Sequence, residues 1–383
     1  MSVGQRAASG TVYLDEAATT PLRRDVLAAM GPYLGPAFGN PSSHHEVGEA
    51  ARDALAGARR DVAQALGARP GEIIFTSGGT EADNLAVKGI ALAEPRGRHV
   101  VVSAVEHPAV LESARWLGRI GFDVTELPVD GDGLVDPQTL AGALREDTTL
   151  VSIQHANNEV GTVQPLTELA AVAAERGVPL HTDAVQSAPW LDLDVGRLGV
   201  QALSLSGHKL GAPKGVGVLW LRRGVPLEPV MHGGGQESGH RSGTENVAGA
   251  VGVAAALRLL DHSLVGDVAA RRDRFVQRVL EAVPGARLTG HATQRLAGHA
   301  SFVLPGRSGE SVLLDLERRG IVCSSGSACH AGSDEPSHVL TAMGIEREVA
   351  QSAVRFTFGA ATGEDQLDAA AEALADVVVP VAR

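Results

Sequence analysis

The sequence predicts an α/β protein: a large domain with a mainly parallel sheet flanked by helices, followed by a smaller α+β domain at the C-terminus. Short β-branched runs alternate with longer segments of helical character, a pattern typical of strand–helix–strand units. The length of 383 residues is more than one hydrophobic core usually serves, which favours two domains. A weak boundary follows an alanine-rich helix at 247–260, so we expect a large domain at residues 11–262 and a small one at 263–383.

The individual elements follow from local patterns. Residues 1–10 are small and polar and are expected to form a loose extension. Between Glu46 and Leu66 apolar residues recur at helical spacing and predict a helix. In the small domain we expect strands at 300–305 and 320–324, with the N-terminal segment packed on that domain. Short apolar or β-branched runs predict buried strands in the large domain at 72–76, 99–103, 150–154, 178–183, 201–206 and 215–221.

Composition and charge exclude several classes of function. An aromatic fraction of 3% and a net charge of −12 argue against nucleic-acid binding, which relies on base stacking and clustered cations. No run approaches the ~18 uninterrupted apolar residues of a membrane span, and the first ten residues lack the apolar core of an export signal. The two cysteines, Cys323 and Cys329, do not make a disulfide framework. We therefore expect a cytoplasmic protein without direct contact to membranes or nucleic acids.

Polar side chains follow the predicted strands of the large domain. In open α/β sheets, ligands bind in the crevice beyond the carboxyl ends of the strands. Those ends carry the segments "SGGTEADN", "AVEHPAV", "HANNEVG", "DAVQS" and "SGHKLGAPKG". The side chains that we expect to converge on one crevice are Thr80, His107, Asn158, Asp183, Gln186, Ser206, His208 and Lys209.

Three of these positions carry distinct chemistry. The segment "SGGTEADN" combines two glycines and a threonine with a helix start that has Glu81 and Asp83 in its first turn. Such a start binds anions, phosphate above all, although most segments of this kind are only turns. Lys209 directly after a strand would be partly desolvated, which makes its neutral amine available for a Schiff base; an ordinary surface lysine is the alternative. Asp183 ends a buried strand, where an acid needs a cationic partner.

Together these groups match the needs of one cofactor. Pyridoxal phosphate (PLP) needs a lysine for its aldehyde, an anion site for its phosphate and a carboxylate that keeps its ring nitrogen protonated. Lys209, the helix start in "SGGTEADN" and Asp183 supply all three at successive strand ends. Gln186 can donate to the phenolate oxygen of the ring, and His107 can cover the ring face. The residues therefore predict a PLP enzyme.

The chain resembles cysteine desulfurases, PLP enzymes of fold type I that are related to class V aminotransferases. The resemblance runs from about Val12 to Leu374. It implies a PLP-dependent sulfurtransferase that removes sulfur from L-cysteine and gives L-alanine and an enzyme persulfide. The ordered motifs that carry it are "YLDEAATTP", "FGNPSS", "TSGGTEADN", "EHPAV", "NNEVG", "HTDAVQS", "SGHKLGAPKG", "GGGQE", "RSGTEN", "SSGSAC" and "RFTFG".

The resemblance also implies roles for single residues. Lys209 would carry the cofactor as a Schiff base, and His107 would stack on its ring and shuttle protons. Arg355 and Asn158 would bind the substrate carboxylate, the arginine through a bidentate fork. Thr244 would reach the cofactor phosphate of a neighbouring subunit, which implies a homodimer with shared active sites. The expected cofactor-binding set is Gly79, Thr80, His107, Asn158, Asp183, Gln186, Ser206, Gly207, His208, Lys209 and Thr244.

The motif "SSGSAC" ends at Cys329, which the resemblance identifies as the catalytic thiol that attacks the substrate sulfur and carries it as a persulfide. The small residues around it would give the thiol reach. The chain resembles the long-loop class, which hands sulfur to a scaffold or carrier protein for iron–sulfur cluster assembly or thio-modification. Cys329 is also a candidate transient ligand of an acceptor's cluster. No resident metal site is expected: Cys323 is interpreted as a small buried residue, and His44 and His45 as neighbours that point apart.

Two other functions stay open on the sequence. The first is a different PLP reaction, such as that of a selenocysteine lyase, a transaminase or a C–S lyase that releases free sulfide; transamination has no need of Cys329. The second is a non-catalytic sulfur carrier, which has no need of Lys209 and Asp183 together. The chain also departs from the usual residues of the family at Glu16, Ser238 and His330, and the last two leave the choice of acceptor open.

Overall fold

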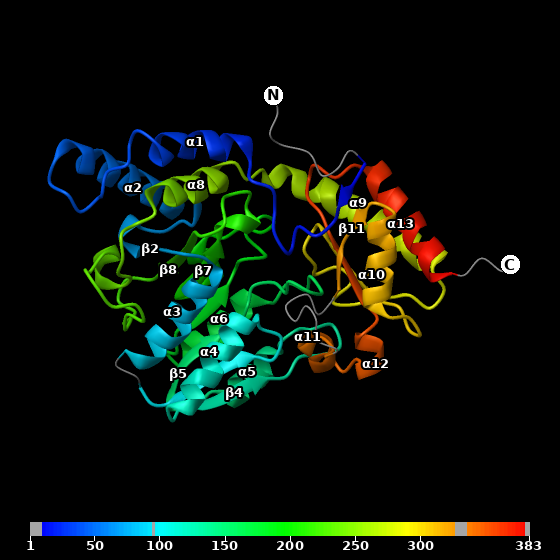
Figure 1. The fold of residues 1–383 in the computed structure, drawn as a ribbon. Coiled ribbons are helices and arrows are strands. Elements are labelled where there is room, and N and C mark those ends of the chain that lie inside the picture. Colours follow the sequence, from blue (N-terminus) through cyan, green and yellow to red (C-terminus); the bar gives the residue numbers. More distant parts are fainter. Residues whose placement is uncertain (1–9, 94–95, 326–334, 380–383) are drawn as a thin grey trace.

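The computed structural model describes residues 10–93, 96–325 and 335–379. Two sheets organise them (Figure 1). The strands of a seven-stranded sheet lie between Ile73 and Leu221, and those of a four-stranded sheet between Arg287 and Ser325 and at Ala353–Thr357. The predicted α/β class with a mainly parallel main sheet is confirmed. The domain division after residue 262 stays a prediction.

The seven-stranded sheet has the order β2–β8–β7–β6–β5–β3–β4. Strands β7, β6, β5, β3 and β4 run parallel, whereas β8 is antiparallel to both β7 and β2. The sequence missed β4, an edge strand in which Leu127 is the buried residue. The bounds are β2 Ile73–Thr76, β3 His99–Ser103, β4 Asp123–Leu127, β5 Thr148–Ser152, β6 Leu180–Asp183, β7 Ala202–Ser206 and β8 Gly217–Leu221.

Helices cover both faces of this sheet. Val100 and Val102 of β3 point into a core with α3 and α4, while Val101 between them points into a second core with α2, α6 and α8. Burial on both faces explains why the three central residues of β3 are all valine. The predicted helices at 46–66 and 247–260 correspond to α2 and α8. The bounds are α1 Arg24–Leu34, α2 Glu46–Ala65, α3 Gly79–Leu92, α4 Pro108–Arg119, α5 Pro137–Ala143, α6 Leu166–Glu175, α7 Val195–Leu198 and α8 Val247–Arg258.

The C-terminal part packs helices on an antiparallel sheet of order β12–β13–β10–β9. Four phenylalanines form its centre, with Phe275 of α9 in edge contact with Phe302, Phe356 and Phe358. The expected strand at 300–305 corresponds to β10, and that at 320–324 divides into β11 and β12. The bounds are α9 Val265–Ala282, β9 Arg287–Leu288, β10 His299–Val303, α10 Gly309–Arg318, β11 Ile321–Val322, β12 Ser324–Ser325, α11 His338–Ala342, α12 Arg347–Ala350, β13 Ala353–Thr357 and α13 Glu364–Val378.

A segment near the N-terminus joins the two sheets. Strand β1 (Val12–Tyr13) pairs in parallel with β11, and the chain then continues past Thr357 of β13 to the end of β7. At that end Thr20 donates its backbone N–H to the carbonyl of His208 over 3.0 Å. Residues 14–20, which we call the N-terminal strap, therefore lie where the two sheets meet.

Among the described residues, no single helix is long and apolar enough to cross a membrane. Helices 247–258 and 262–282 pass that test as a pair, but the pair is bent by 48°.

Candidate active site

A cavity of about 540 Å³ lies beyond the ends of β2, β3, β5, β6 and β7. The N-terminal strap contributes Ala17 and Ala18 to its wall. The structure brings most of the predicted site residues together here, although they are far apart in the sequence. Those that line the cavity are Gly79, Thr80, His107, Asn158, Asp183, Gln186, Ser206, His208, Lys209 and Arg355.

The start of α3 forms one end of the cavity. Its N-cap, Gly78, makes no side-chain cap, so the first-turn amides of the helix are free to meet an anion. Glycine is required at position 79, because a Cβ there would lie 2.9 Å from Val185 Cγ2. The nearby charge of Glu81 is balanced: its carboxylate accepts the N–H of Ser77 and forms an ion pair with Arg241 at 2.8 Å. This end of the cavity therefore suits a phosphate group.

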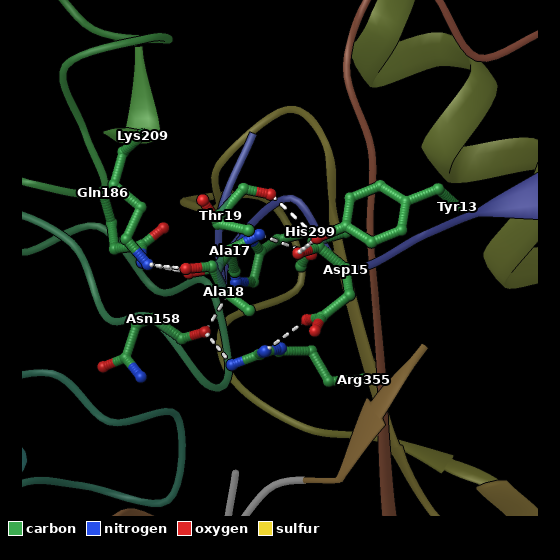
Figure 2. A network of polar contacts seen from close by, with 11 residues as sticks. Tyr13, Asp15, Ala17, Ala18, Thr19, Asn158, Gln186, Lys209, His299 and Arg355 are labelled. Carbon is green, nitrogen blue, oxygen red and sulfur yellow. Dashed lines mark hydrogen bonds and ion pairs between the residues drawn. The ribbon is translucent and has the colours of Figure 1, made fainter. Parts of the chain in front are cut away.

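Lys209 stands in a short 3₁₀ turn, η2 (Gly207–Lys209), directly after β7. Its Nζ donates to the carbonyl oxygens of Ala17 and Ala18 in the N-terminal strap, the latter at 2.8 Å (Figure 2). Gln186 Nε2 donates to the same Ala17 carbonyl at 2.9 Å. The strap thus aims the amine of Lys209 and the amide of Gln186 at one point of the cavity wall. His208 beside them is neutral at physiological pH, since burial lowers its pKa to about 4.

A histidine and two buried acids form the base of the cavity. Asp183 ends β6 and accepts the N–H of Val185 at 2.8 Å, and His107 caps α4 through Nδ1. One donor atom each of His107, Asp183 and Asp83 lies within 4.8 Å of the others. A divalent cation could also use such a set, so the expected absence of a metal site stays a prediction. Burial raises the pKa of Asp183, but His107 and Lys209 oppose the rise.

His107 is suited to accept a proton. Burial lowers its pKa below the ordinary histidine value, with Lys209 acting in the same direction and Asp183 against it. Its Nδ1 accepts the N–H of Ala109 at 3.1 Å, which leaves Nε2 as the ring nitrogen toward the cavity. A neutral imidazole fixed in this way can stack on a ring and move a proton at one known atom.

Arg355 reaches the opposite side of the cavity from β13 and is 2% exposed. Its Nη1 donates to the backbone carbonyl of Asn158 at 3.0 Å, and its Nη2 forms an ion pair with Asp15 at 2.7 Å (Figure 2). Its buried Nε has no hydrogen-bond partner. His299 Nε2 bonds to the same Asn158 carbonyl at 2.9 Å. The structure thus places Asn158 and Arg355 together and leaves the Nε nitrogen of the guanidinium without a partner.

Two of the predicted residues that the structure describes do not line the cavity. Gly207 is buried under η2, where a Cβ would lie 2.8 Å from Val216 Cγ1, so it serves packing. Thr244 is exposed and does not line the cavity of its own chain. Cys329, with its neighbour His330, lies outside the described residues. Cys323 is half-buried against the small hydrophobic core, and burial raises the pKa of its thiol to about 12.

Two residues of the site had no assigned role in the sequence analysis. Asp15 was seen only as part of the "YLDEAATTP" motif, and its partner Arg355 is 340 positions away. Asp83 was seen only as an acid in the first turn of a helix. The signal that could have found it is its place on the face of α3 that also carries the buried Ala82, Ala86 and Ile90.

Comparison with known proteins gives the family. The family model for class V aminotransferases matches residues 12–370. The cysteine desulfurase IscS of Dictyoglomus turgidum is 46% identical over 371 residues, which cover 96% of this chain and 94% of that protein. An IscS-like cysteine desulfurase of Mycobacterium tuberculosis is 47% identical over 382 residues, or 97% of both chains.

Solved structures agree with these relatives. A NifS-like protein has a TM-score of 0.90 at 36% identity, covering 96% of this chain and 99% of its own. A structure described as SspA in complex with cysteine has a TM-score of 0.81 at 37% identity, covering 91% and 99%. The resemblance seen in the sequence is therefore confirmed. The chain belongs to the class V aminotransferase family and, within it, to the cysteine desulfurases.

Proposed function

We propose that the chain is a PLP-dependent enzyme that removes sulfur from L-cysteine, releases L-alanine and keeps the sulfur as a persulfide on Cys329. One observation carries the proposal. A single cavity holds a lysine, a carboxylate with a histidine beside it, an uncapped helix start and a buried arginine. These groups suit an amino acid bound to PLP, and they occur in a chain that is 47% identical to a cysteine desulfurase.

The cavity fits the cofactor. The phosphate would lie at the start of α3, near Thr80, Ser206 and His208, where Gly79 leaves the room that a side chain would fill. Asp183 would face the ring nitrogen, Gln186 the phenolate oxygen, and Lys209 the aldehyde. When bound there, PLP supplies an electron sink for the carbon atoms of the substrate. A volume of about 540 Å³ leaves space for an amino acid beside it.

Side chains of this chain would bind the substrate and move its protons. The unused Nε of Arg355 marks a ligand site, because a buried donor without a partner is rare in folded proteins. We assign the substrate carboxylate to it, with Asn158 beside it. His107 and Lys209 lie on the Asp183 side of the cavity and are the groups placed to take and return protons.

The sulfur transfer balances without a further reactant. The Cys329 thiolate attacks the substrate sulfur, a new S–S bond forms, and the C–S bond of the substrate breaks. The electron pair of that bond stays on carbon, which takes up a proton and becomes the methyl group of alanine. Cysteine plus the enzyme thiol thus becomes alanine plus an enzyme persulfide. An acceptor protein for iron–sulfur cluster assembly or thio-modification would then take the sulfur.

Incubation of the purified, PLP-loaded protein with L-cysteine tests the proposal. We expect alanine to form and the intact mass to rise by one sulfur atom, with the added atom on the peptide that contains Cys329. Alanine with free sulfide and no added sulfur on the chain would instead show a C–S lyase. If no alanine forms, L-cysteine is not a substrate of this enzyme.

Arg355→Lys is expected to raise KM for L-cysteine by about 10- to 100-fold with a smaller change in kcat. The reason is that a lysine has no donor in the place of Nε, and a hydrogen bond to a charged group contributes about 1.5–3 kcal/mol. Steady-state alanine release over a range of cysteine concentrations measures both KM and kcat. Arg287→Lys, the same change at an exposed position of β9, is the control. An unchanged KM would show that Arg355 does not bind substrate.

We also propose a homodimer with shared active sites in the cytoplasm. Apolar side chains lie exposed on α1 and the segments around it, with Phe38 80% exposed. Leu27 and Leu34 lie two turns apart on α1, and exposed apolar surface on one helix face is a mark of an interface. Thr244, exposed and outside the cavity of its own chain, is free to serve the neighbouring subunit. Sedimentation should give the mass of two chains. The other exposed apolar residues of these segments are Leu22, Leu27, Leu34, Val47, Val230 and Met231.

A further inference from the structure

Asp83 is a buried acid that the steps above do not use. It lies on α3 with its side chain toward the main sheet and is 1% exposed. Its Oδ1 has no hydrogen-bond partner. A buried carboxylate without a cation is costly, whereas a neutral carboxylic acid in the same place is not. The protonation state of Asp83 is therefore decided by the groups that face it.

Those groups provide no positive charge. His181 of β6 has Nε2 3.7 Å from Asp83 Oδ1, but it is fully buried and bonds to Ser152 and Ser204 at 2.9 Å each. Burial lowers the pKa of His181 to about 3, so it is neutral. Ser204 of β7 is an uncharged hydroxyl beside the Asp83 carboxyl. One donor atom of His107 also lies within 4.8 Å of one from Asp83, and burial lowers the pKa of His107. The remaining charged neighbours, Asp183 and Glu106, are acids themselves.

Asp83 and Asp183 have different charged neighbours. Asp183 has His107 and Lys209 near it, and both favour its charged form. At Asp83, burial and the two acids raise the pKa well above the ordinary value of an aspartate, although a hydrogen bond from Ser204 acts in the opposite direction. Since two close, buried acids do not both ionise readily, the charge of the pair belongs on Asp183.

We propose that Asp83 is a positioning residue for Asp183: it stays a neutral carboxylic acid behind it, so that Asp183 is the single negative charge at the base of the cavity. This inference rests on the proposed function, in which Asp183 faces the ring nitrogen of PLP. A second charge at Asp83 would change how strongly that nitrogen holds its proton. The two acids together then carry one negative charge.

Thermal unfolding of the cofactor-free protein tests the protonation state directly. An acid that is neutral when folded and ionised when unfolded makes the folded chain bind one more proton, so its stability falls as pH rises. Asp83→Asn removes this pH-dependent contribution to stability. We expect the Tm of the Asn variant, relative to the wild type, to rise steadily between about pH 5 and pH 8. A pH-independent difference would overturn the proposal, because it would mean that Asp83 is ionised when folded.

Asp136→Asn is the matched control. Asp136 caps α5 at the surface, and hydrogen bonds from Thr139 lower its pKa, so it is ionised in both states above about pH 5. The Tm of its variant should differ from that of the wild type by a constant amount over the same pH range. Infrared spectra of the cofactor-free protein give an independent reading. Asp83→Asn should lose intensity in the band of neutral carboxylic acids, and an unchanged band would contradict the proposal.

The positioning role is tested in the PLP-loaded protein. The visible absorbance of the lysine-bound cofactor changes with pH, and its midpoint reports the charge near the ring. We expect the midpoint of Asp83→Asn to equal that of the wild type, and that of Asp183→Asn to move by more than about one pH unit. If Asp83→Asn moves the midpoint in the same direction as Asp183→Asn, Asp83 carries charge and the proposal fails.

These tests separate this inference from the proposed function. A chain that forms no alanine from L-cysteine would refute the proposed reaction. The unfolding and infrared measurements on the cofactor-free protein would still decide whether Asp83 is neutral.

Discussion

Replacing Lys209 by alanine is expected to remove alanine formation from L-cysteine, a loss of at least ~10⁴-fold in kcat/KM, because in the proposed reaction this one side chain both binds the cofactor and moves protons. The amine is fixed in the cavity by the carbonyls of Ala17 and Ala18. Removing it leaves the aldehyde of PLP without a Schiff-base partner. Alanine release and visible absorbance after addition of PLP measure the effect. The absorbance of a lysine-bound cofactor should be absent.

Lys214→Ala is the control for this prediction. Among the described residues, Lys214 is the other lysine on the cavity wall, and it is exposed. Its loss should leave the absorbance of the lysine-bound cofactor in place. A Lys209→Ala protein that retains that absorbance and forms alanine near the wild-type rate would assign the Schiff base to another lysine.

The strand ends were the most informative part of the sequence. Each of β3, β5, β6 and β7 is buried along its length and ends at a polar residue, so both the strand and the polar group at its end could be predicted. Parallel strands share one edge for their carboxyl ends, and that rule alone places Asp183 and Lys209 at the same cavity. Strand β4 could not be found in this way, because an edge strand exposed on one side carries a polar sequence.

Residues that act through distant partners could not be predicted. Glu237 was quoted as part of the "GGGQE" motif, yet the structure buries its carboxylate against both terminal nitrogens of Arg59, at 2.7 and 2.8 Å, and the N–H of Phe75 at 2.9 Å. Glu237 and Ser238 also adopt positive φ angles of 48° and 57°, a conformation disfavoured for both residue types. Partners 178 and 162 positions away leave no local pattern in the sequence.

The same limit applies inside the site. Asp83 lies on a helix face that is otherwise apolar. This indicates that the fold holds a polar group there, but it does not indicate which residues surround that group. Asp183, His181 and Ser204, which lie around it, come from two strands that start about 100 residues later in the chain. Only the register of β6 against β7, with Asp183 opposite Ser204, brings them to the same face as α3. Sequence patterns predicted the groups that would meet the proposed cofactor, whereas the groups behind them became visible only in the packing.

Replacing Cys329 by serine is expected to lower alanine formation by ~10³-fold or more and to remove the added sulfur atom from the protein. A thiolate is a strong nucleophile toward sulfur, whereas a serine hydroxyl keeps its proton at neutral pH and cannot form a persulfide. The visible absorbance of bound PLP should be unchanged, since the substitution leaves Lys209 and Asp183 intact. Alanine release and intact mass after incubation with L-cysteine measure both effects in one sample.

Cys323→Ser is the matched control, because it removes the second cysteine of the chain by the same change. Burial raises the pKa of the Cys323 thiol to about 12, so it stays protonated at neutral pH and is a poor nucleophile. Its variant should therefore form alanine and gain sulfur as the wild type does. If instead the Cys323→Ser variant gains no sulfur, the persulfide forms on Cys323 and not on Cys329, which contradicts our proposal. If both variants release alanine and free sulfide at the wild-type rate, the reaction needs no thiol of the enzyme, and the chain is a lyase.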